Sequence, residues 1–169
     1  MSRTKAILRV GILTVSDACS RGEREDTSGA SLEEWCRLEG HEVALRATLP
    51  DETSALVPLL LGWADEGEVD VIFTTGGTGF GPRDVTPEAT RAVLEKEAPG
   101  LSEVIRRRGE SATPFASISR GLVGARGQVL IANLPGSPGG VRDGLEIMGP
   151  FLEHLSALLK DEATSHRPS

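Results

Sequence analysis

The 169-residue sequence has few of the residues on which disulfide, metal-thiolate and histidine chemistry depend. Its two cysteines, Cys19 and Cys36, match neither a metal-ligand spacing nor a disulfide framework. Its three histidines lie far apart in the chain, so we do not expect them to form one cluster. The sequence also lacks an apolar run of about 18 residues and a segment that resembles a signal peptide. These absences predict a reduced, cytoplasmic protein with no membrane partner.

Lysine is also scarce, since it supplies only three of the 18 basic residues, and the net charge is −7. The isoelectric point is about 5.0. A wide nucleic-acid interface needs many cations on one face, so we expect no nucleic-acid partner. Any bound anion must be held locally, and most of the positive charge available for this is arginine, whose planar group suits two-point contact with phosphate.

The chain is organised around residues 71–88, with the sequence VIFTTGGTGFGPRDVTPE. Residues 69–75 are apolar and β-branched, which predicts a strand buried on both faces, as in a parallel sheet. Three glycines within residues 76–79 then permit positive φ angles and close approach of a ligand to the backbone. Successive N–H groups in such a loop form a nest for an anion, most often phosphate.

A helix should follow this glycine loop, because Thr86 can serve as its N-cap and Pro87 as its first residue, with Glu88 in the first turn. No Lys-Ser or Lys-Thr pair follows the glycines, so the loop is not a Walker motif, nor does it have the setting of a dinucleotide fingerprint. The alternative is a glycine-rich turn that binds nothing.

Strand and helix patterns alternate along the chain, which predicts an α/β fold, a three-layer α/β/α sandwich with a mainly parallel sheet. The expected strands cover residues 6–16, 41–49, 69–75 and 128–134, with a further short apolar run at 118–123. The first expected helix begins at Thr27, at Ser28 or at a capping box at 31–34, and it ends at Gly40. The second follows residue 52 and contains Pro58. Three further helices are expected at 87–96, 101–108 and 138–160, with a break at 98–100 between the first two of these. We expect one domain over residues 1–160 and a polar, frayed tail at 161–169.

A second glycine-proline loop, residues 133–140, ends another buried strand and leads into the last helix, with Ser137 as cap and Pro138 as first residue. Two strands therefore deliver glycine-rich loops onto helix N-termini, each with about half a positive charge and free N–H groups. We expect two adjacent anion sites, with the polar loop at residues 18–29 as a lid over the first glycine loop.

Three carboxylates should lie at the carboxyl ends of the strands: Asp17, Asp51 and Asp84. A carboxylate and a phosphate repel each other by roughly 4 kcal/mol at ~4 Å and an effective dielectric constant of ~20. A divalent cation would relieve this repulsion, and oxygen ligands combined with phosphate favour Mg²⁺. Two alternatives stay open: that Asp51 only caps a helix, and that Asp84 only pairs with a neighbouring arginine.

Five motifs together resemble those of a known family: TVSD at 14–17, LPDE at 49–52, TTGGTGFGPRDVTPEAT at 74–90, TPFASISR at 113–120 and NLPGSP at 133–138. The chain is similar to the MogA/MoaB family of molybdenum cofactor biosynthesis, whose relatives include the G domains of gephyrin and of plant Cnx proteins. The resemblance extends from about residue 7 to residue 159.

This resemblance implies a molybdopterin adenylyltransferase, which uses ATP and Mg²⁺ to convert molybdopterin to adenylyl-molybdopterin with release of pyrophosphate. Asp51 and Asp84 match the family's two essential aspartates, and we expect them to be catalytic and to organise the metal. Ser119 matches a serine linked to pterin binding. The full set of expected substrate-binding residues is Ser16, Asp17, Thr75, Gly76, Gly77, Thr78, Gly79, Arg83, Ser119, Arg120, Pro135, Gly136, Ser137 and Pro138.

Within the family, MoaB-type members can lack the aspartate of the PRD motif, and the intact PRDVTPEAT here favours the active type. The resemblance implies a homotrimer or a hexamer made of two trimers, and handover of product to a molybdate-inserting protein. Two non-catalytic alternatives are a molybdopterin-binding carrier and a scaffold subunit. Nothing in the sequence assigns nucleotide and pterin to one glycine loop or the other.

Overall fold

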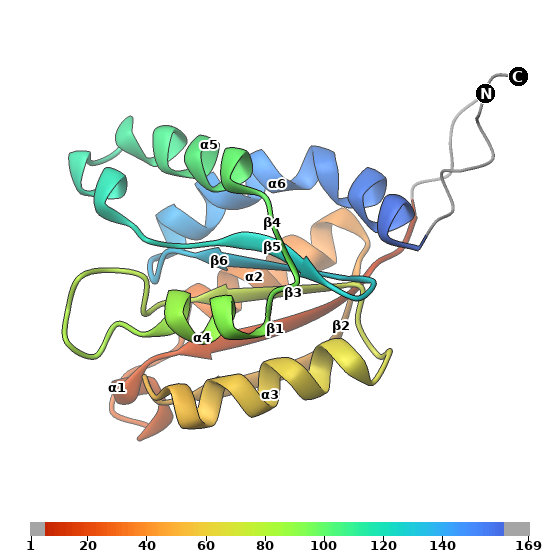
Figure 1. Ribbon diagram of the computed structural model, residues 1–169. Coiled ribbons are helices and arrows are strands. Elements are labelled where there is room, and N and C mark those ends of the chain that lie inside the picture. The colour runs from red at the N-terminus through yellow and green to blue at the C-terminus, as the bar shows by residue number, and fades with distance from the viewer. Residues whose placement is uncertain (1–5, 161–169) are drawn as a thin grey trace, which may run out of the picture.

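Apolar runs of the sequence form the buried centre of a six-stranded sheet in the computed structural model, which describes residues 6–160 (Figure 1). Within that range the strands are β1 (Arg9–Val15), β2 (Glu42–Leu49), β3 (Val71–Thr75), β4 (Lys96–Glu97), β5 (Val123–Arg126) and β6 (Val129–Leu134). The helices are α1 (Asp17–Ser20), α2 (Thr27–Glu39), α3 (Thr53–Asp65), α4 (Thr86–Val93), α5 (Pro99–Glu110), α6 (Pro138–Leu159) and the short 3₁₀ helix η1 (Pro114–Ile118).

The strand order is β2-β1-β3-β6-β5-β4. The four strands β2, β1, β3 and β6 are parallel, and β5 runs antiparallel to both β6 and β4. Thr14 of β1 lies opposite Thr75 of β3, so these two strands end side by side. The prediction of a mainly parallel sheet is therefore confirmed.

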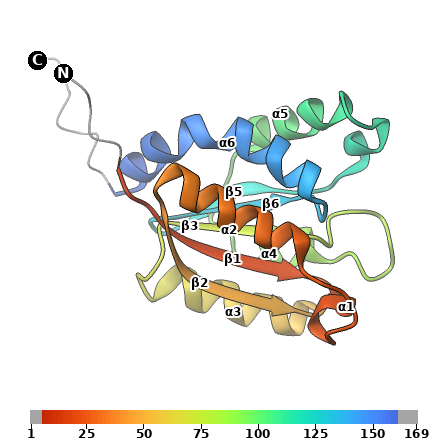
Figure 2. The ribbon, with the colours of Figure 1, turned by 180° about the vertical axis from the view of Figure 1, so that it is seen from behind.

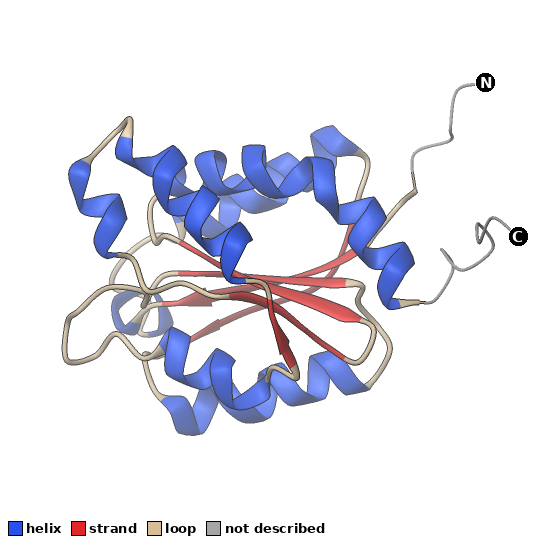
Figure 3. Ribbon diagram, turned by 45° about the horizontal axis from the view of Figure 1, so that its top comes forward, coloured by secondary structure: helices blue, strands red, loops and turns tan. Residues whose placement is uncertain are grey.

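Helices cover both faces of the sheet, as Figures 2 and 3 show. One face packs against α2, α5 and α6 through a core that includes Phe73, Leu32 and Met148. The other face packs against α3 and α4 through a core that includes Ile72 and Leu60. The predicted three-layer sandwich is confirmed, and burial of every residue of β3 explains its unbroken apolar pattern.

The start of α2 agrees with one of the three predicted alternatives. Its N-cap is Asp26, whose side chain accepts a hydrogen bond from the Gly29 N–H group at 2.8 Å. The helix therefore begins at Thr27, one of the predicted starts, and the capping box at residues 31–34 is wrong because those residues already lie inside the helix. Gly40 closes α2 with a φ of 75°, as predicted.

Other helix boundaries also required correction. Thr86 is the first residue of α4 rather than its cap, and its hydroxyl group bonds the Gly76 carbonyl instead. The predicted helix at 87–96 ends at Val93, because residues 96–97 pair with β5 as a short strand. Pro99 opens α5 rather than breaking a helix, since proline suits a first turn. The helix η1 was not predicted.

The remaining predictions are mixed. Ser137 caps α6 by accepting from the Gly140 N–H group, as predicted. Pro58 lies inside α3, which starts at Thr53. Of the short apolar run at residues 118–123, only Val123 belongs to a strand, as the first residue of β5. The frayed tail predicted at 161–169 lies outside the described residues. None of the helices among residues 6–160 combines the length and the apolar character of a membrane-spanning segment.

Candidate active site

The chain leaves β1 and β3 in opposite directions, toward α2 on one face of the sheet and toward α4 on the other (Figure 1). Such a divergence is the usual ligand position in an open parallel sheet. A cavity of about 360 Å³ lies there, and we call it the polar cleft. Among the residues that line it are Ser16, Arg24, Asp51, Gly76, Gly77, Asp84 and Ser137.

The first glycine loop needs its glycines for steric reasons. Gly76 and Gly77 have φ angles of 96° and 67°. A Cβ atom on Gly76 would lie 2.2 Å from the Val15 carbonyl oxygen. A Cβ atom on Gly77 would lie 2.3 Å from Thr86 Oγ1 and 2.9 Å from Asp51 Oδ1. The loop is therefore packed between the end of β1, the start of α4 and the Asp51 carboxylate, with no room for a side chain.

The second glycine loop lies directly against the first. Thr75 Oγ1 donates a hydrogen bond to the Pro135 carbonyl at 2.8 Å, and the Gly76 N–H group donates to the Leu134 carbonyl at 3.2 Å. A Cβ atom on Gly136 would lie 3.1 Å from Gly76 Cα. The predicted juxtaposition of the two loops is confirmed, but the Gly76 N–H group is engaged by Leu134 and is not a free donor.

Asp51 is held by the turn that follows β1. Its Oδ2 atom accepts a hydrogen bond from the Asp17 N–H group at 2.9 Å, and its own N–H group donates to Asp17 Oδ1 at 3.0 Å. The N-cap of α3 is Glu52, not Asp51, so the interpretation of Asp51 as a cap of that helix is wrong. Burial, followed by the nearby negative charges of Asp17 and Asp84, raises the pKa of Asp51.

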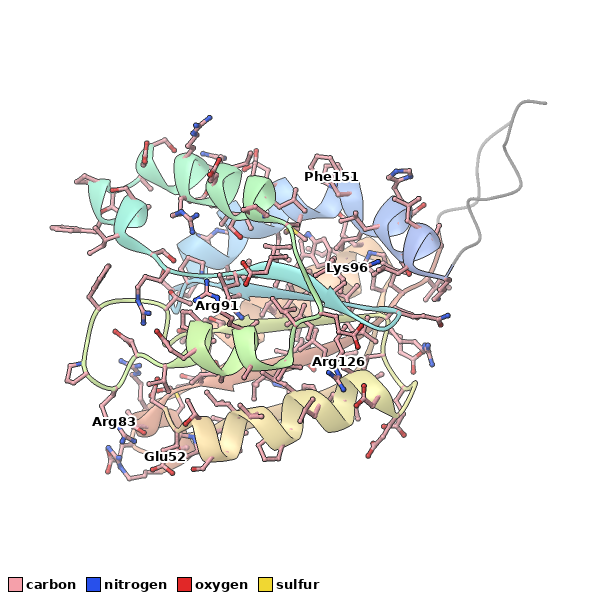
Figure 4. The ribbon with its side chains drawn as sticks, viewed as in Figure 1. Glu52, Arg83, Arg91, Lys96, Arg126 and Phe151 are labelled. Atoms are coloured by element: carbon pink, nitrogen blue, oxygen red, sulfur yellow. The ribbon has the colours of Figure 1, made fainter. Side chains whose placement is uncertain are left out.

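Arg83 pairs with Asp17 rather than with the cleft carboxylates. Its guanidinium group makes a two-point contact with Asp17, from Nε to Oδ2 and from Nη2 to Oδ1, both at 3.0 Å. It also reaches Glu52 at 3.4 Å, and Figure 4 shows the two side chains next to each other. The Arg83 contact, together with the Asp51 N–H group, lowers the pKa of Asp17.

Asp84 stands at the end of the loop that follows the glycines. Its Oδ2 atom accepts a hydrogen bond from the Gly81 N–H group at 2.8 Å, and a Cβ atom on Gly79 would lie 2.9 Å from the same oxygen. Arg83, the arginine beside it in sequence, pairs with Asp17 and so is not the neighbouring arginine that the pairing alternative for Asp84 requires. Asp84 instead lines the polar cleft with Asp51.

Arg120 binds the loop between Gly79 and Asp84 through hydrogen bonds to its carbonyl groups. Its side chain donates to the Gly79 carbonyl at 2.8 Å and to the Asp84 carbonyl at 2.9 Å, and it pairs with Glu88. Its guanidinium group also lies over the Phe80 ring, 5.4 Å from the ring centre. Neither Arg120 nor Arg83 lines the polar cleft in this structure, and their contact with phosphate stays a prediction.

The carboxylates fit a magnesium ion that is bound together with phosphate. Within residues 6–160, no group of three or more His, Cys, Asp or Glu side chains could hold a metal ion by itself. Asp51 and Asp84 line one cleft, and the charge of Asp84 acts on the ionisation of Asp51. Two carboxylates are the usual protein share of a Mg²⁺ site completed by water and substrate phosphates.

A second cavity, of about 380 Å³, lies on the other side of the glycine loops between α5, η1 and the start of α6. We call it the apolar cleft, because Ile105, Phe115, Ile118 and Pro135 line much of it. Ser119 lines it too, and its Oγ atom lies 3.4 Å from Thr78 Oγ1. Ser137 lines both clefts, so the two cavities are neighbours.

The predicted site residues divide between these cavities. The polar cleft contains Ser16, Asp51, Thr75, Gly76, Gly77, Asp84, Gly136, Ser137 and Pro138. The apolar cleft contains Thr78, Gly79, Ser119, Pro135 and Ser137. Asp17, Arg83 and Arg120 line neither.

Sequence reasoning missed three charged residues of the polar cleft, of which Arg24 is the cation and Glu25 and Asp26 are the anions. Arg24 lies in the loop between α1 and α2 and lines the cleft. Its sequence context, RGERED, is a run of mixed charges, which is typical of a solvated loop and does not single out one arginine. The loop was predicted to cover the first glycine loop, and its residues 24–26 do form part of the cleft wall.

Comparison with known families gives a consistent result. A family model described as a probable molybdopterin binding domain matches residues 11–154. The chain is 36% identical over 158 residues to molybdopterin adenylyltransferase of Helicobacter pylori strain J99, covering 90% of this chain and 88% of that protein.

Two further relatives extend this comparison. The chain is 43% identical over 158 residues to the molybdenum cofactor synthesis protein cinnamon of Drosophila melanogaster, a match that covers 91% of this chain but only 26% of that protein's length. Among solved structures, the molybdopterin biosynthesis enzyme MoaB of Thermus thermophilus is similar, with 48% identity and a TM-score of 0.85. That match covers 92% of this chain and 98% of the other.

Proposed function

The chain belongs to the family of molybdopterin-binding domains of molybdenum cofactor biosynthesis, and we propose that it is a molybdopterin adenylyltransferase. The observation that carries this proposal is the pair of neighbouring clefts separated by two glycine loops, with Asp51 and Asp84 together in the polar one. A transferase for two anionic substrates needs two sites that meet at the reacting atoms, and this arrangement supplies them.

In the proposed reaction, a terminal phosphate oxygen of molybdopterin attacks the α-phosphorus of ATP. The bond between that phosphorus and the bridging oxygen to the β-phosphate breaks, and pyrophosphate leaves with the electron pair. The attacking phosphate is already anionic, so no general base is required. Catalysis then consists of alignment and of compensating the charge that builds up at the α-phosphate.

Asp51 and Asp84 would hold the Mg²⁺ ion, which supplies charge neutralisation at the phosphates when bound. The chain's own contribution is to fix these two carboxylates. Asp51 is fixed by the backbone of Asp17, and Asp84 by the Gly81 N–H group. Both anchors are backbone N–H groups, one at the start of α1 and one in the loop after β3, so the carboxylates keep their places before any ligand arrives.

We assign the nucleotide to the polar cleft and the pterin to the apolar cleft. The polar cleft contains both aspartates and lies at the N-terminus of α6, which favours phosphate. The apolar cleft offers ring-sized apolar walls beside Ser119, the residue that matches the family's pterin-linked serine. Ser137, which lines both cavities, marks where the reacting phosphates would meet.

The test is transfer of labelled AMP from α-labelled ATP to freshly prepared molybdopterin in the presence of Mg²⁺. The proposal requires a labelled pterin product that forms only when all three components are present. Binding of molybdopterin without any transfer would favour the carrier function instead. A homotrimer or hexamer, handover to a molybdate-inserting protein and a cytoplasmic location stay predictions.

A further inference from the structure

We propose that Arg24 is a substrate-binding residue that contacts the β- or γ-phosphate of the nucleotide in the polar cleft. This inference rests on the proposed adenylyl transfer, and it adds a residue that neither the motifs nor the family resemblance assigns. It comes from the charges that line the cleft and from the contacts that the other nearby arginines already make.

The wall of the polar cleft is rich in negative charge. Glu25, Asp26, Asp51 and Asp84 all line it, whereas Arg24 is the one cation among the described residues that do so. A nucleoside triphosphate brings several further negative charges, and like charges repel strongly at short range in a partly enclosed site. A Mg²⁺ ion held by Asp51 and Asp84 would compensate only part of this charge, so a cationic side chain is needed on the remaining wall.

The two arginines expected from the motifs are not placed for this role in the structure. Arg83 makes the two-point contact with Asp17. Arg120 donates hydrogen bonds to the Gly79 and Asp84 carbonyls and pairs with Glu88. Releasing either one would remove support from the loops that hold the catalytic carboxylates.

The side chain of Arg24 makes weaker contacts than those of Arg83 and Arg120. Within the described part of the chain, its one hydrogen bond runs from Nη2 to Ser16 Oγ and is 3.4 Å long. A contact of that length between exposed groups is easily exchanged for a charge-assisted bond to phosphate. Ser16 itself lines the cleft at the end of β1, so this contact keeps the guanidinium group beside the cavity.

The N-terminus of α6 forms a second positively charged part of the cleft wall, besides Arg24. It includes Ser137 and Pro138, the cap and first residue of the 22-residue helix α6. The N-terminus of a helix carries about half a positive charge. Phosphates in the cleft would thus meet Arg24 from the loop before α2 and the positive end of α6 from the loop after β6.

The chain offers a matched control in Arg21, three residues earlier in the same loop. Arg21 is also exposed, but it makes a two-point contact with Glu23 at 2.9 Å and does not line the cleft. A loss of general positive charge from the loop would be the same in Arg21→Ala and Arg24→Ala. Only a direct phosphate contact distinguishes them.

The test is calorimetric titration of the full chain with Mg²⁺-ATP and, separately, with AMP, without molybdopterin. We expect Arg24→Ala to weaken ATP binding about tenfold or more, the usual effect of losing a charge-assisted hydrogen bond. AMP lacks the β- and γ-phosphates, so the affinity for AMP should change less than about threefold. Arg24→Lys should restore part of the ATP affinity, and Arg21→Ala should bind ATP like the wild type.

Equal ATP affinities of Arg24→Ala and Arg21→Ala would overturn the inference while leaving adenylyl transfer intact. Equal losses of ATP and AMP affinity in Arg24→Ala would also overturn it, since the contact would not be with the outer phosphates. A folded wild type that binds no ATP would instead contradict the proposed function itself. Thermal unfolding of each variant verifies that the exposed substitutions leave the fold intact.

Discussion

Asp17 and Asp51 each accept a hydrogen bond from the other's backbone N–H group, at 2.9 Å for the Asp17 N–H and 3.0 Å for the Asp51 N–H. This reciprocal pair joins the end of β1 to the end of β2. Arg83, from the loop after β3, then binds the outer side of Asp17. Three strand ends are therefore linked through one carboxylate, and Asp51 is oriented by this linkage.

Arg83→Ala should lower kcat at least about tenfold, because small displacements of catalytic groups have large effects on rate. The positioning role depends on two-point geometry, so Arg83→Lys should restore little of the activity. The measurement is the steady-state rate of AMP transfer, with thermal unfolding to verify that the fold is intact.

Arg91→Ala is the matched control for this prediction. Arg91 lies on α4 (Figure 4), pairs with Glu97, and is 59% exposed, compared with 56% for Arg83. We expect Arg91→Ala to have wild-type kcat. If Arg83→Ala and Arg91→Ala behave alike, the linkage through Asp17 does not position Asp51.

Gly77→Ala should impair both stability and activity. The added Cβ atom would meet Thr86 Oγ1 and Asp51 Oδ1, in a residue whose φ is 67°. Gly67→Ala is the control, since its φ is 76° but nothing lies within 4 Å of the added atom. Both variants carry the left-handed strain of about 1 kcal/mol, and overpacking should cost Gly77→Ala about 1–3 kcal/mol more.

Urea unfolding of the two glycine variants measures this difference directly. The steric clash acts on Asp51 as well, so Gly77→Ala should also lose most AMP transfer, whereas Gly67→Ala should keep it. Equal free energies of unfolding and equal rates in the two variants would contradict the close packing of the glycine loop.

Asp70 should make stability depend on acid pH. Its side chain is only 4% exposed and pairs with Arg9 at 3.0 Å and with Lys160 at 2.8 Å. Burial opposes ionisation, but the bonds from Arg9 and Lys160 outweigh it and lower the pKa from 3.8 to about 2. A lowered pKa in the folded state stabilises the protein above pH 3.8, and this stabilisation is lost as the pH falls toward 2.

The expected loss is about 2 kcal/mol of unfolding free energy, from the size of this pKa difference. Urea unfolding between about pH 6 and pH 2 measures it, and Asp70→Asn should remove this part of the pH dependence. Asp65→Asn, which removes an exposed pair with Arg126, should change the profile much less. An unchanged acid profile in Asp70→Asn would show that the Arg9 and Lys160 contacts are not formed in solution.

Ser119→Ala should distinguish the ligands that we assign to the two clefts. We expect it to weaken molybdopterin binding about fivefold or more through loss of a hydrogen bond, with ATP affinity unchanged. Ser117→Ala is the control, because Ser117 bonds the Pro114 carbonyl and does not line the apolar cleft. A loss of ATP affinity in Ser119→Ala would contradict the assignment of pterin to that cleft.

Much of the fold could be predicted, because its strongest signals are local. The buried run that becomes β3 and the glycines after it define a strand and a tight loop by their own chemistry. The strand β2 lies at an edge of the sheet, and apolar residues alternate along its sequence, as is typical of a strand with one face toward the core. The short strand β4 could not be predicted, since two residues carry no periodicity and the pairing partner is distant in the chain.

The arrangement within the site was harder to predict. Sequence proximity placed Arg83 beside Asp84, but its contact is with Asp17, 66 positions earlier. Arg120 was predicted to hold phosphate, and its carbonyl contacts with a loop that lies far from it in the chain were not foreseen. The partner of an arginine is set by the tertiary fold, and the local sequence gives no measure of it.

Adenylyl transfer is tested by measuring pyrophosphate release from Mg²⁺-ATP, with and without freshly prepared molybdopterin, in the wild type and in Asp84→Asn. Asp84 lines the polar cleft without lying in the core, so the variant should fold and still bind molybdopterin. We predict release that requires molybdopterin in the wild type and falls to background in Asp84→Asn. Absence of pyrophosphate release from a folded wild type that binds molybdopterin would contradict adenylyl transfer. Equal release from both proteins would contradict the role of Asp84 in that transfer.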